Sequence, residues 1–270
     1  VAGNHDLGNE LMAREWERRR GHRYYYFLYQ DVLFLVISTD DPFPVQMSAE
    51  QEAYFEKVLK DNPNPRWTMV FLHNPTWQLE PTRRQKESGY PYQNRWTRFD
   101  DMLRGRNYTV FAGHTHDYFY ERRNGGQEHI VLATTSGGSE LRGPGAYGEF
   151  DEIAWVTMTD SGPKVANLEL DGILPVDIRT AQTMRLVERV SRAAPRGSSI
   201  HADGEIFTSG STSVRLHNPA GSEANLRIEL SAPPPLSVEP SLIDMDMGPV
   251  TSQSVILKVT APPDTKTDSI

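Results

Sequence analysis

The chain of 270 residues contains no cysteine. Disulfides and thiolate metal sites are therefore excluded, and any metal ion must be held by histidine, asparagine, aspartate or glutamate. Basic residues are also in the minority, with 28 Lys and Arg against 36 Asp and Glu and a net charge of -8. Because a general nucleic-acid surface needs clustered positive charge, we expect none here.

Long apolar runs are missing as well. No stretch of the sequence approaches the length that spans a bilayer, so we expect no membrane span. The first residues carry no signal-peptide pattern either. The composition is thus that of a globular protein, and its length allows one large core and a smaller module.

Near the middle of the chain, two histidines follow an apolar run directly. The run Tyr108-Thr109-Val110-Phe111-Ala112 has the composition of a buried strand and continues into Gly113-His114-Thr115-His116. Two imidazoles therefore emerge, two residues apart, where a strand ends. Histidine pairs at such a position are typical metal ligands in α/β folds.

Two further segments have the same design. The apolar run Trp67–Leu72 continues into His73, followed by Asn74 and Pro75, and Val1-Ala2 continues into Gly3-Asn4-His5-Asp6. Each segment places an imidazole or an amide at the end of a hydrophobic strand. The carboxyl ends of strands in an α/β sheet are where such folds bind their ligands.

Taken in order, the three motifs GNHD, strand-His-Asn-Pro and GHTH resemble those of the calcineurin-like metallophosphoesterases, over about the first 170 residues. The resemblance implies an α/β (α+β) fold, a partial four-layer α/β/β/α sandwich. It also implies hydrolysis of phosphomonoesters or phosphodiesters at a centre of two metal ions. Mixed histidine, asparagine and aspartate ligands suit iron, manganese or zinc and do not choose among them.

The resemblance also assigns roles to single residues. Asn4, His73 and His114 match ligands of one metal, and His116 matches a ligand of the other. His5 matches the histidine that donates a proton to the leaving oxygen, with Asp6 orienting its ring. A neighbouring carboxylate favours protonated imidazole, which suits that task.

Two parts of the family pattern are not found in the sequence. The family carries an Asp-x-His and a Gly-Asp motif ahead of GNHD, and these supply three more ligands, whereas this chain begins at Val1 and reaches GNHD at once. We therefore expect an N-terminally truncated chain that lacks one or two strand-helix units. Such a chain alone should bind metal weakly and have little or no hydrolase activity.

A long irregular segment between Asn74 and Asn94 contains Arg83, Arg84, Tyr90 and Tyr92. Arginine forks match phosphate oxygens, so these side chains are candidates for binding the phosphoester substrate, although a solvated loop is the interpretation we favour. We expect Gly137 and Gly138 only to permit a turn. The remaining histidines have no such context and are interpreted as surface or structural residues, namely His22, His129, His201 and His217.

Periodicity predicts the other elements of the first part of the chain. Ser48 and Gln51 form a capping box ahead of an amphipathic helix that ends before Pro63, and a second short helix is expected around Trp96–Leu103. The aromatic run Tyr24-Tyr25-Tyr26-Phe27 is expected to be strand core. Alternating runs around turn residues predict three hairpins, formed by 24–29 with 32–38, 117–122 with 129–133, and 153–159 with 164–170.

Three regions follow from these patterns. Residues 1–175 are expected to form the metallophosphoesterase domain, 176–203 a connector that is helical around 179–190, and 204–270 a small all-β, immunoglobulin-like module. The last assignment rests on short alternating runs at 212–216, 226–231 and 254–260, separated by proline and glycine.

A second hypothesis remains open. The chain is either a secreted or periplasmic hydrolase, or a non-catalytic remnant that serves as a scaffold for its C-terminal binding module. The sequence indicates neither the substrate nor the oligomeric state.

Overall fold

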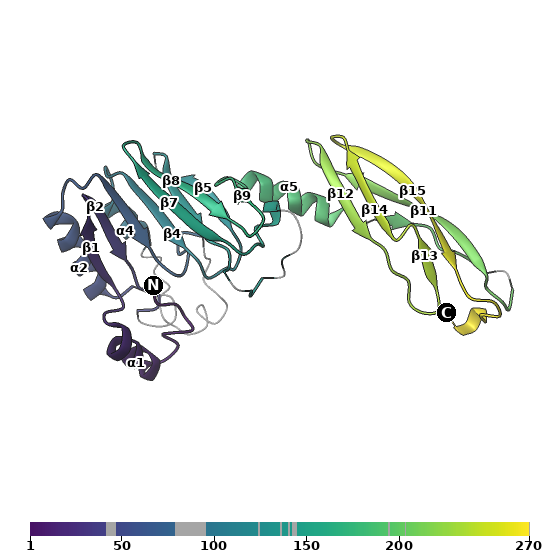
Figure 1. Cartoon of the computed structure of the whole chain (residues 1–270), viewed down its shortest axis with the longest axis horizontal. Helices are drawn as coiled ribbons and strands as arrows, with labels where there is room; N and C mark the ends of the chain where they lie inside the picture. Colours follow the sequence, from purple (N-terminus) through teal and green to yellow (C-terminus); the bar gives the residue numbers. More distant parts are fainter. Residues whose placement is uncertain are drawn as a thin grey trace. The chain divides into compact units, whose positions relative to one another are not determined.

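The computed structural model describes residues 1–41, 47–78, 96–123, 125–135, 137–139, 141, 145–193, 195–202 and 204–269. The substrate candidates Arg83, Arg84, Tyr90 and Tyr92 lie outside these residues. The chain forms two compact units, Val1–Thr183 and Met184–Ile270 (Figure 1). Within the described ranges, no helix has both the length and the apolar character needed to cross a membrane.

A six-stranded sheet is the centre of the first unit, with the order β1-β2-β3-β4-β6-β5. Its strands are β1 (Tyr25–Tyr29), β2 (Val32–Val36), β3 (Trp67–Phe71), β4 (Tyr108–Ala112), β5 (Phe119–Arg123) and β6 (Gln127–Val131). The four inner strands β2, β3, β4 and β6 run parallel, and the edge strands β1 and β5 pair antiparallel with their neighbours. The carboxyl ends of β3 and β4 therefore meet at the same edge.

Helices cover one face of this sheet. The helices α2 (Ala49–Asp61) and α4 (Trp96–Met102) lie close to their predicted positions. Their apolar side chains pack on alternate residues of the strands, in one cluster that includes Leu33, Leu35, Phe55, Val70 and Phe99. The crossover from β2 through α2 to β3 is the βαβ arrangement that places His73 at the end of its strand.

The start of α2 departs from the predicted capping box in one respect. The hydroxyl of Ser48 accepts from the amide of Gln51, as expected. The Gln51 side chain, however, does not return to the cap. Its amide accepts from the Ser38 backbone N–H at 2.9 Å and donates to the Ser38 carbonyl at 2.9 Å. Gln51 thus fixes the helix to the chain just beyond β2.

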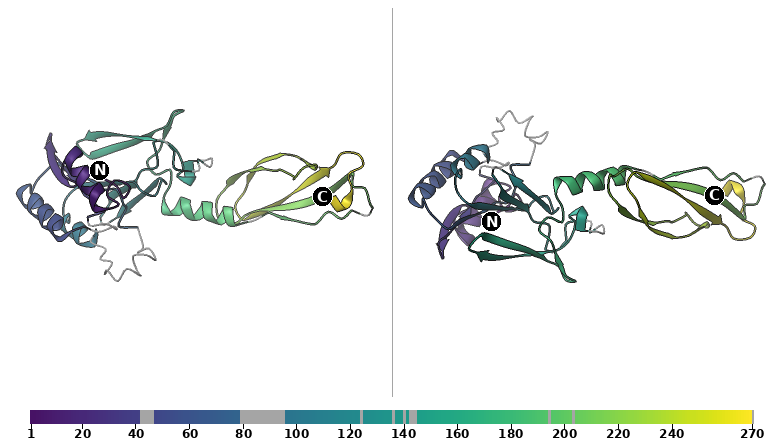
Figure 2. Two further views of the ribbon diagram at one scale, coloured as in Figure 1. Left: turned by 90° about the horizontal axis from the view of Figure 1, so that it is seen from below. Right: turned by 90° about the horizontal axis from the view of Figure 1, so that it is seen from above.

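A second sheet covers the opposite face. The strands β7 (Ile153–Thr159), β8 (Gly162–Leu168) and β9 (Ile173–Leu174) form it in that order. Val156 and Val165 from this sheet share a core with Val32, Met69 and Phe111 from the six-stranded sheet. The described residues of the first unit therefore form three layers, helices, large sheet and small sheet (Figure 2). Helices on both outer faces, which the family resemblance implies, are not seen in them.

The prediction that the aromatic run at Tyr24–Phe27 forms strand core is wrong for Tyr25, Tyr26 and Phe27, whereas Tyr24, just ahead of β1, is half-buried and packs against the core cluster. The side chains of β1 are between 40% and 63% exposed. The reason is topological, because β1 is the edge strand of the sheet. The hairpin turn that joins β1 to β2, at Gln30 and Asp31, adopts positive φ angles of 47° and 61°.

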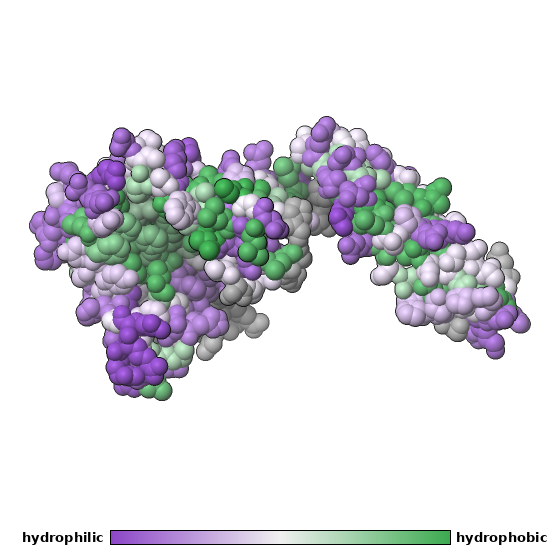
Figure 3. All heavy atoms as spheres, viewed as in Figure 1, coloured by the Kyte–Doolittle hydropathy of each residue, from purple (hydrophilic) through white to green (hydrophobic). Residues whose placement is uncertain are grey.

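Apolar side chains also gather on the surface over the β7–β9 sheet, where Ile153, Trp155 and Ile173 are exposed (Figure 3).

One helix has no counterpart among the sequence predictions. The helix α1 (Glu10–Arg20) contains no buried residue. Asn9 caps it by accepting from the amide of Met12 at 3.0 Å, and Glu15 pairs with Arg18 and Arg19. Capping and charge pairs support this helix in place of an apolar face, so hydrophobic periodicity gives no signal for it.

The second unit contains two antiparallel sheets. One has the order β10-β11-β15-β13 and the other pairs β12 with β14. Their bounds are β10 (Arg196–Gly197), β11 (Ser209–Asn218), β12 (Ala224–Glu229), β13 (Ser237–Glu239), β14 (Leu242–Met247) and β15 (Thr251–Thr260), and α5 (Ala181–Arg192) precedes them. Leu216 and Leu257 of the first sheet share a core with Ile243 and Met247 of the second. The strand β10 lies inside the region predicted to be a connector and pairs with β11.

Candidate metal centre

The parallel pairing of β3 and β4 brings two of the predicted ligands together. The strands pair from Thr68 with Tyr108 to Phe71 with Phe111, and the ladder continues past both strand ends. The amide of Leu72 donates to the carbonyl of Phe111 at 3.0 Å, and the amide of Gly113 donates to the carbonyl of His73 at 2.9 Å. His73 is therefore held directly beside the loop that carries His114.

The loop after β4 has an uncommon backbone. His114 and His116 adopt positive φ angles of 74° and 62°. Side chains other than glycine rarely occupy this region, and strain of this kind costs about 1–3 kcal/mol per residue. Two such residues within three positions indicate that the surrounding structure fixes this loop. The turn directs the imidazole of His114 toward His73, with ring centroids 5.0 Å apart.

The third predicted ligand, Asn4, lies in the first turn of the chain. The amide of Gly3 donates to the Asp6 carboxylate at 3.0 Å, and the amides of Asp6 and Leu7 donate to the Gly3 carbonyl. Leu7 is buried and anchors this turn. As a result the side chain of Asn4 reaches the two histidines.

One side-chain atom from each of three residues lies within 3.2 Å of the other two, and we call this arrangement of Asn4, His73 and His114 the triangle. Asn4 Oδ1 lies 2.9 Å from His73 Nε2 and 3.2 Å from His114 Nδ1, and the two ring nitrogens are 3.2 Å apart. In a hydrogen bond one atom donates and the other accepts, and each atom here takes a single role. With three atoms and only two roles, at least two of the atoms must both be donors or both be acceptors. Those two atoms cannot form a hydrogen bond with each other. Hydrogen bonds alone therefore never satisfy all three contacts, whichever tautomers the rings adopt.

A bound cation resolves this conflict, because all three atoms then offer a lone pair to the same centre. Metal–ligand bonds of about 2.1 Å place neighbouring donor atoms about 3.0 Å apart at right angles and about 3.4 Å apart at tetrahedral angles. The three contacts, 2.9, 3.2 and 3.2 Å, fall within or close to this range. The triangle has the dimensions of one face of a metal coordination shell.

The electrostatics of the two histidines suit the same purpose. Burial, with a smaller contribution from His114, lowers the pKa of His73 to about 4. Burial, together with the nearby His116 and His5, also lowers the pKa of His114. Both rings are therefore neutral at physiological pH. A neutral imidazole has the free lone pair that a metal ligand needs.

The fourth predicted ligand, His116, stands apart from the triangle. Its Nδ1 lies 2.8 Å from the carbonyl oxygen of Gly138, and because a carbonyl only accepts, Nδ1 carries the proton. The other ring nitrogen, Nε2, is then the one with a lone pair. A backbone carbonyl that fixes the tautomer in this way is typical of metal-binding histidines. Gly138 thus does more than permit the turn predicted for it.

The predicted proton donor and its partner lie at the surface of this region. The side chains of His5 and Asp6 are both exposed. Asp6 Oδ2 takes part in the turn by accepting from Gly3, a contact that the sequence did not predict. The role of Asp6 in orienting the His5 ring stays a prediction.

A buried polar network behind the triangle was not found from the sequence. Asn74 is fully buried, and its side-chain amide donates to Thr39 Oγ1 at 2.8 Å and to Asp40 Oδ2 at 2.9 Å. This network ties the segment after β2 to the residue that follows His73. The one signal in the sequence was an asparagine directly after a candidate ligand.

No family model matches this chain, and no curated protein sequence matches it. The family resemblance therefore rests on the three motifs and their order. Within the described ranges, no group of three His, Asp or Glu side chains comes together as a metal site. The triangle of predicted ligands differs from such a group in that its third atom is the amide oxygen of Asn4.

Gly3 gives a direct test of the triangle. A Cβ atom at this position would lie 2.9 Å from three atoms of the His73 ring, a distance that forces the ring to move. We expect Gly3→Ala to weaken Zn²⁺ binding by about tenfold or more, the usual effect of disturbing a ligand's support. The measurement is competition with a fluorescent zinc chelator.

Gly113→Ala is the matched control. A Cβ atom at Gly113 would meet nothing within 4 Å, although this glycine directly precedes His114. The control should retain the wild-type affinity. Equal affinity of both variants and wild type would show that His73 does not bind the metal in this position.

Proposed function

We propose that this chain belongs to a metal-dependent phosphoesterase of the calcineurin-like type, which hydrolyses phosphomonoesters or phosphodiesters. The observation that carries the proposal is the triangle of Asn4, His73 and His114, which no set of hydrogen bonds satisfies. The mostly parallel β-sheet, with the predicted ligands His73 and His114 beyond the carboxyl ends of β3 and β4, supports it, and so does the order of the three motifs. On this proposal the first unit is part of a four-layer α/β/β/α sandwich and the second is an immunoglobulin-like module.

The residues fit a metal centre of this kind. Asn4, His73 and His114 would hold one ion, and His116, with its tautomer fixed by Gly138, would contribute to a second. The bound ions would neutralise phosphoryl oxygens and lower the pKa of a water molecule that attacks phosphorus. Iron, manganese and zinc all accept nitrogen and oxygen ligands of this set.

His5 completes the proposed chemistry. It is exposed and directly follows the ligand Asn4, so it can approach a substrate that the centre holds. We assign to it the proton that the leaving oxygen requires, and to Asp6 the orientation of its ring. General acid catalysis matters most when the leaving group is a poor one.

The test is hydrolysis of two aryl phosphates by the metal-loaded chain, 4-nitrophenyl phosphate with a good leaving group and phenyl phosphate with a poor one. Three protein ligands leave coordination positions open for water, so we expect slow release that a chelator stops. His5→Ala should slow the phenyl ester by about 100-fold or more and the nitrophenyl ester much less, with metal content unchanged.

An equal loss on both esters, together with loss of metal, would show that His5 is a ligand. If the metal-loaded wild type hydrolysed neither ester, the scaffold hypothesis would replace this one.

A further inference from the structure

The second unit contains a cationic pocket that the proposed hydrolase function does not use. Its volume is 410 Å³, and its lining residues are Arg192, Ala193, Arg196, Arg215, His217 and Ser252. No Asp or Glu belongs to this lining, although the unit as a whole carries more acidic than basic residues. Pockets of about 300–1,000 Å³ are the size that small ligands occupy.

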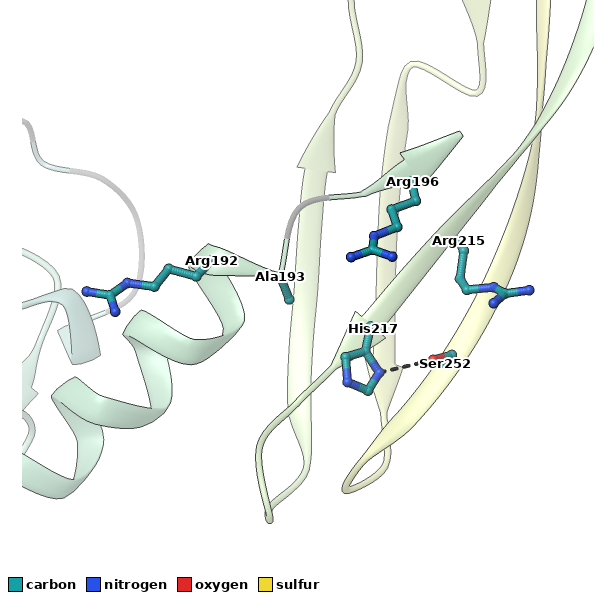
Figure 4. A pocket seen from close by; sticks show the side chains of 6 residues that line it. All are labelled: Arg192, Ala193, Arg196, Arg215, His217 and Ser252. Carbon is teal, nitrogen blue, oxygen red and sulfur yellow. Dashed lines mark hydrogen bonds between the residues drawn. The ribbon is translucent and has the colours of Figure 1, made fainter. Parts of the chain in front are cut away.

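Strand register brings the cations together. Arg196 of β10 pairs directly with Arg215 of β11, and His217 of β11 pairs with Ser252 of β15. Directly opposed residues in an antiparallel sheet point to the same side, and so do residues two apart in one strand. Arg196, Arg215 and His217 therefore share the outer face of this sheet. In Figure 4, Arg192 extends away from them.

The Arg196 and Arg215 pair is unfavourable in the free protein. Like charges directly opposite one another in a sheet are destabilising. In the described part of the chain, neither arginine forms an ion pair with an acidic side chain, whereas Arg192 pairs with Glu188 at 3.6 Å. An anion between the two guanidinium groups would convert this repulsion into attraction.

The other polar groups are compatible with an anion. His217 Nδ1 lies 3.1 Å from the Thr251 carbonyl oxygen and 3.0 Å from Ser252 Oγ. Because the carbonyl only accepts, this contact places a proton on Nδ1. The hydroxyl of Ser252 can then direct its own proton outward. Guanidinium forks and a hydroxyl are the groups that bind tetrahedral oxyanions.

We propose that this pocket binds the phosphate or sulfate group of a small ester. On this proposal His217, which is exposed as the sequence interpretation expects, also takes part in the site. The pocket is larger than the anion alone needs, so it also accepts part of the organic moiety. The proposal is independent of the metal centre, because every residue that lines the pocket belongs to the second unit.

The test is calorimetric titration of the full chain at low salt, in the presence of a chelator so that a metal-bound site contributes nothing. The probes are glucose 6-phosphate, glucose 6-sulfate and glucose. We expect the phosphate ester to bind and glucose not to bind. Equal affinity for the sulfate ester would show that the pocket recognises any tetrahedral oxyanion, and weaker affinity would assign it to phosphate, which carries more charge.

Arg196→Ala and Arg215→Ala should each weaken binding by about tenfold or more, since each removes a charge-assisted contact. Arg215→Lys should bind more weakly than wild type, because a point charge lacks the fork. Arg227→Ala is the matched control, an exposed arginine on β12 that removes the same charge outside the pocket. It should bind as wild type does.

Ligand-free Arg215→Ala should unfold at the same temperature as wild type or at a higher one, because the opposed charges are gone. This measurement shows that the variant is folded. Wild-type affinity in both Arg196→Ala and Arg215→Ala, or glucose binding as tightly as its phosphate, would overturn the proposal.

Discussion

His73→Ala is expected to reduce the affinity for Zn²⁺ by more than about 100-fold, because it removes one of three ligands and leaves two that cannot hold the ion alone. His114→Ala should have the same effect. In the wild type each ring nitrogen lies within 3.2 Å of Asn4 Oδ1, so either substitution opens the triangle. Competition with a zinc chelator measures the affinities.

His22→Ala is the control for this experiment, since His22 is exposed and remote in sequence from all three motifs. It should bind zinc as wild type does. Circular dichroism checks that the two ligand variants are folded. If both variants retained wild-type affinity, the triangle would be a packing arrangement and the metal would bind elsewhere.

Glu152 provides the second large effect, this time on stability. This side chain is only 5% exposed, and burial raises its pKa to about 7. Its carboxylate accepts from the amide of Ala133 at 2.8 Å through Oε1, whereas no hydrogen bond to Oε2 is found among the described residues. A carboxyl group in this setting is more stable when it is protonated.

The direction of the pH effect follows from this pKa. The folded state holds the Glu152 proton up to about pH 7, while the unfolded state loses it near its ordinary value of 4.5. The folded state therefore binds more protons in this window, and stability falls as the pH rises through it. A shift of this size corresponds to about 3 kcal/mol.

We therefore expect the free energy of unfolding of Glu152→Gln, relative to wild type, to rise by about 3 kcal/mol between pH 4.5 and pH 7.5. Burial lowers the pKa values of His73 and His129 to about 4, and this contribution makes stability rise with pH. Because wild type and Glu152→Gln both contain these histidines, the contribution cancels in the difference between their free energies of unfolding. All five tryptophans lie in residues 1–183, so their fluorescence reports the first unit alone.

Glu56→Gln, at an exposed position of α2, is the control and should show no such change with pH. Urea unfolding at several pH values gives the free energies. A constant difference between Glu152→Gln and wild type across the window would show that Glu152 is ionised in the folded state.

Local sequence patterns were sufficient to predict the helices and strands that bury an apolar face. The strands β3 and β4 and the helix α2 lie where periodicity and capping residues predicted them, because each contributes to the buried cluster around Val70 and Phe55. The helix α1 buries nothing and left no such pattern. The exposure of β1 depends on its place at the sheet edge, which is a property of the whole fold.

The candidate site was predictable to a similar degree. Strand ends identified His73 and His114 as neighbours, since parallel strands end at the same edge. The contact of Gly3 with the His73 ring and that of Gly138 with His116 come from distant segments, and no local pattern marks them. Arg196 and Arg215 likewise become neighbours only through strand register, across 19 positions of the sequence.

Anomalous X-ray diffraction from crystals of the chain soaked in Zn²⁺ tests the metal centre most directly. We expect a peak about 2.0–2.2 Å from each of Asn4 Oδ1, His73 Nε2 and His114 Nδ1. Those three atoms should remain close to their present separations of 2.9–3.2 Å. Zinc bound only elsewhere, with the triangle intact and empty, would contradict this expectation.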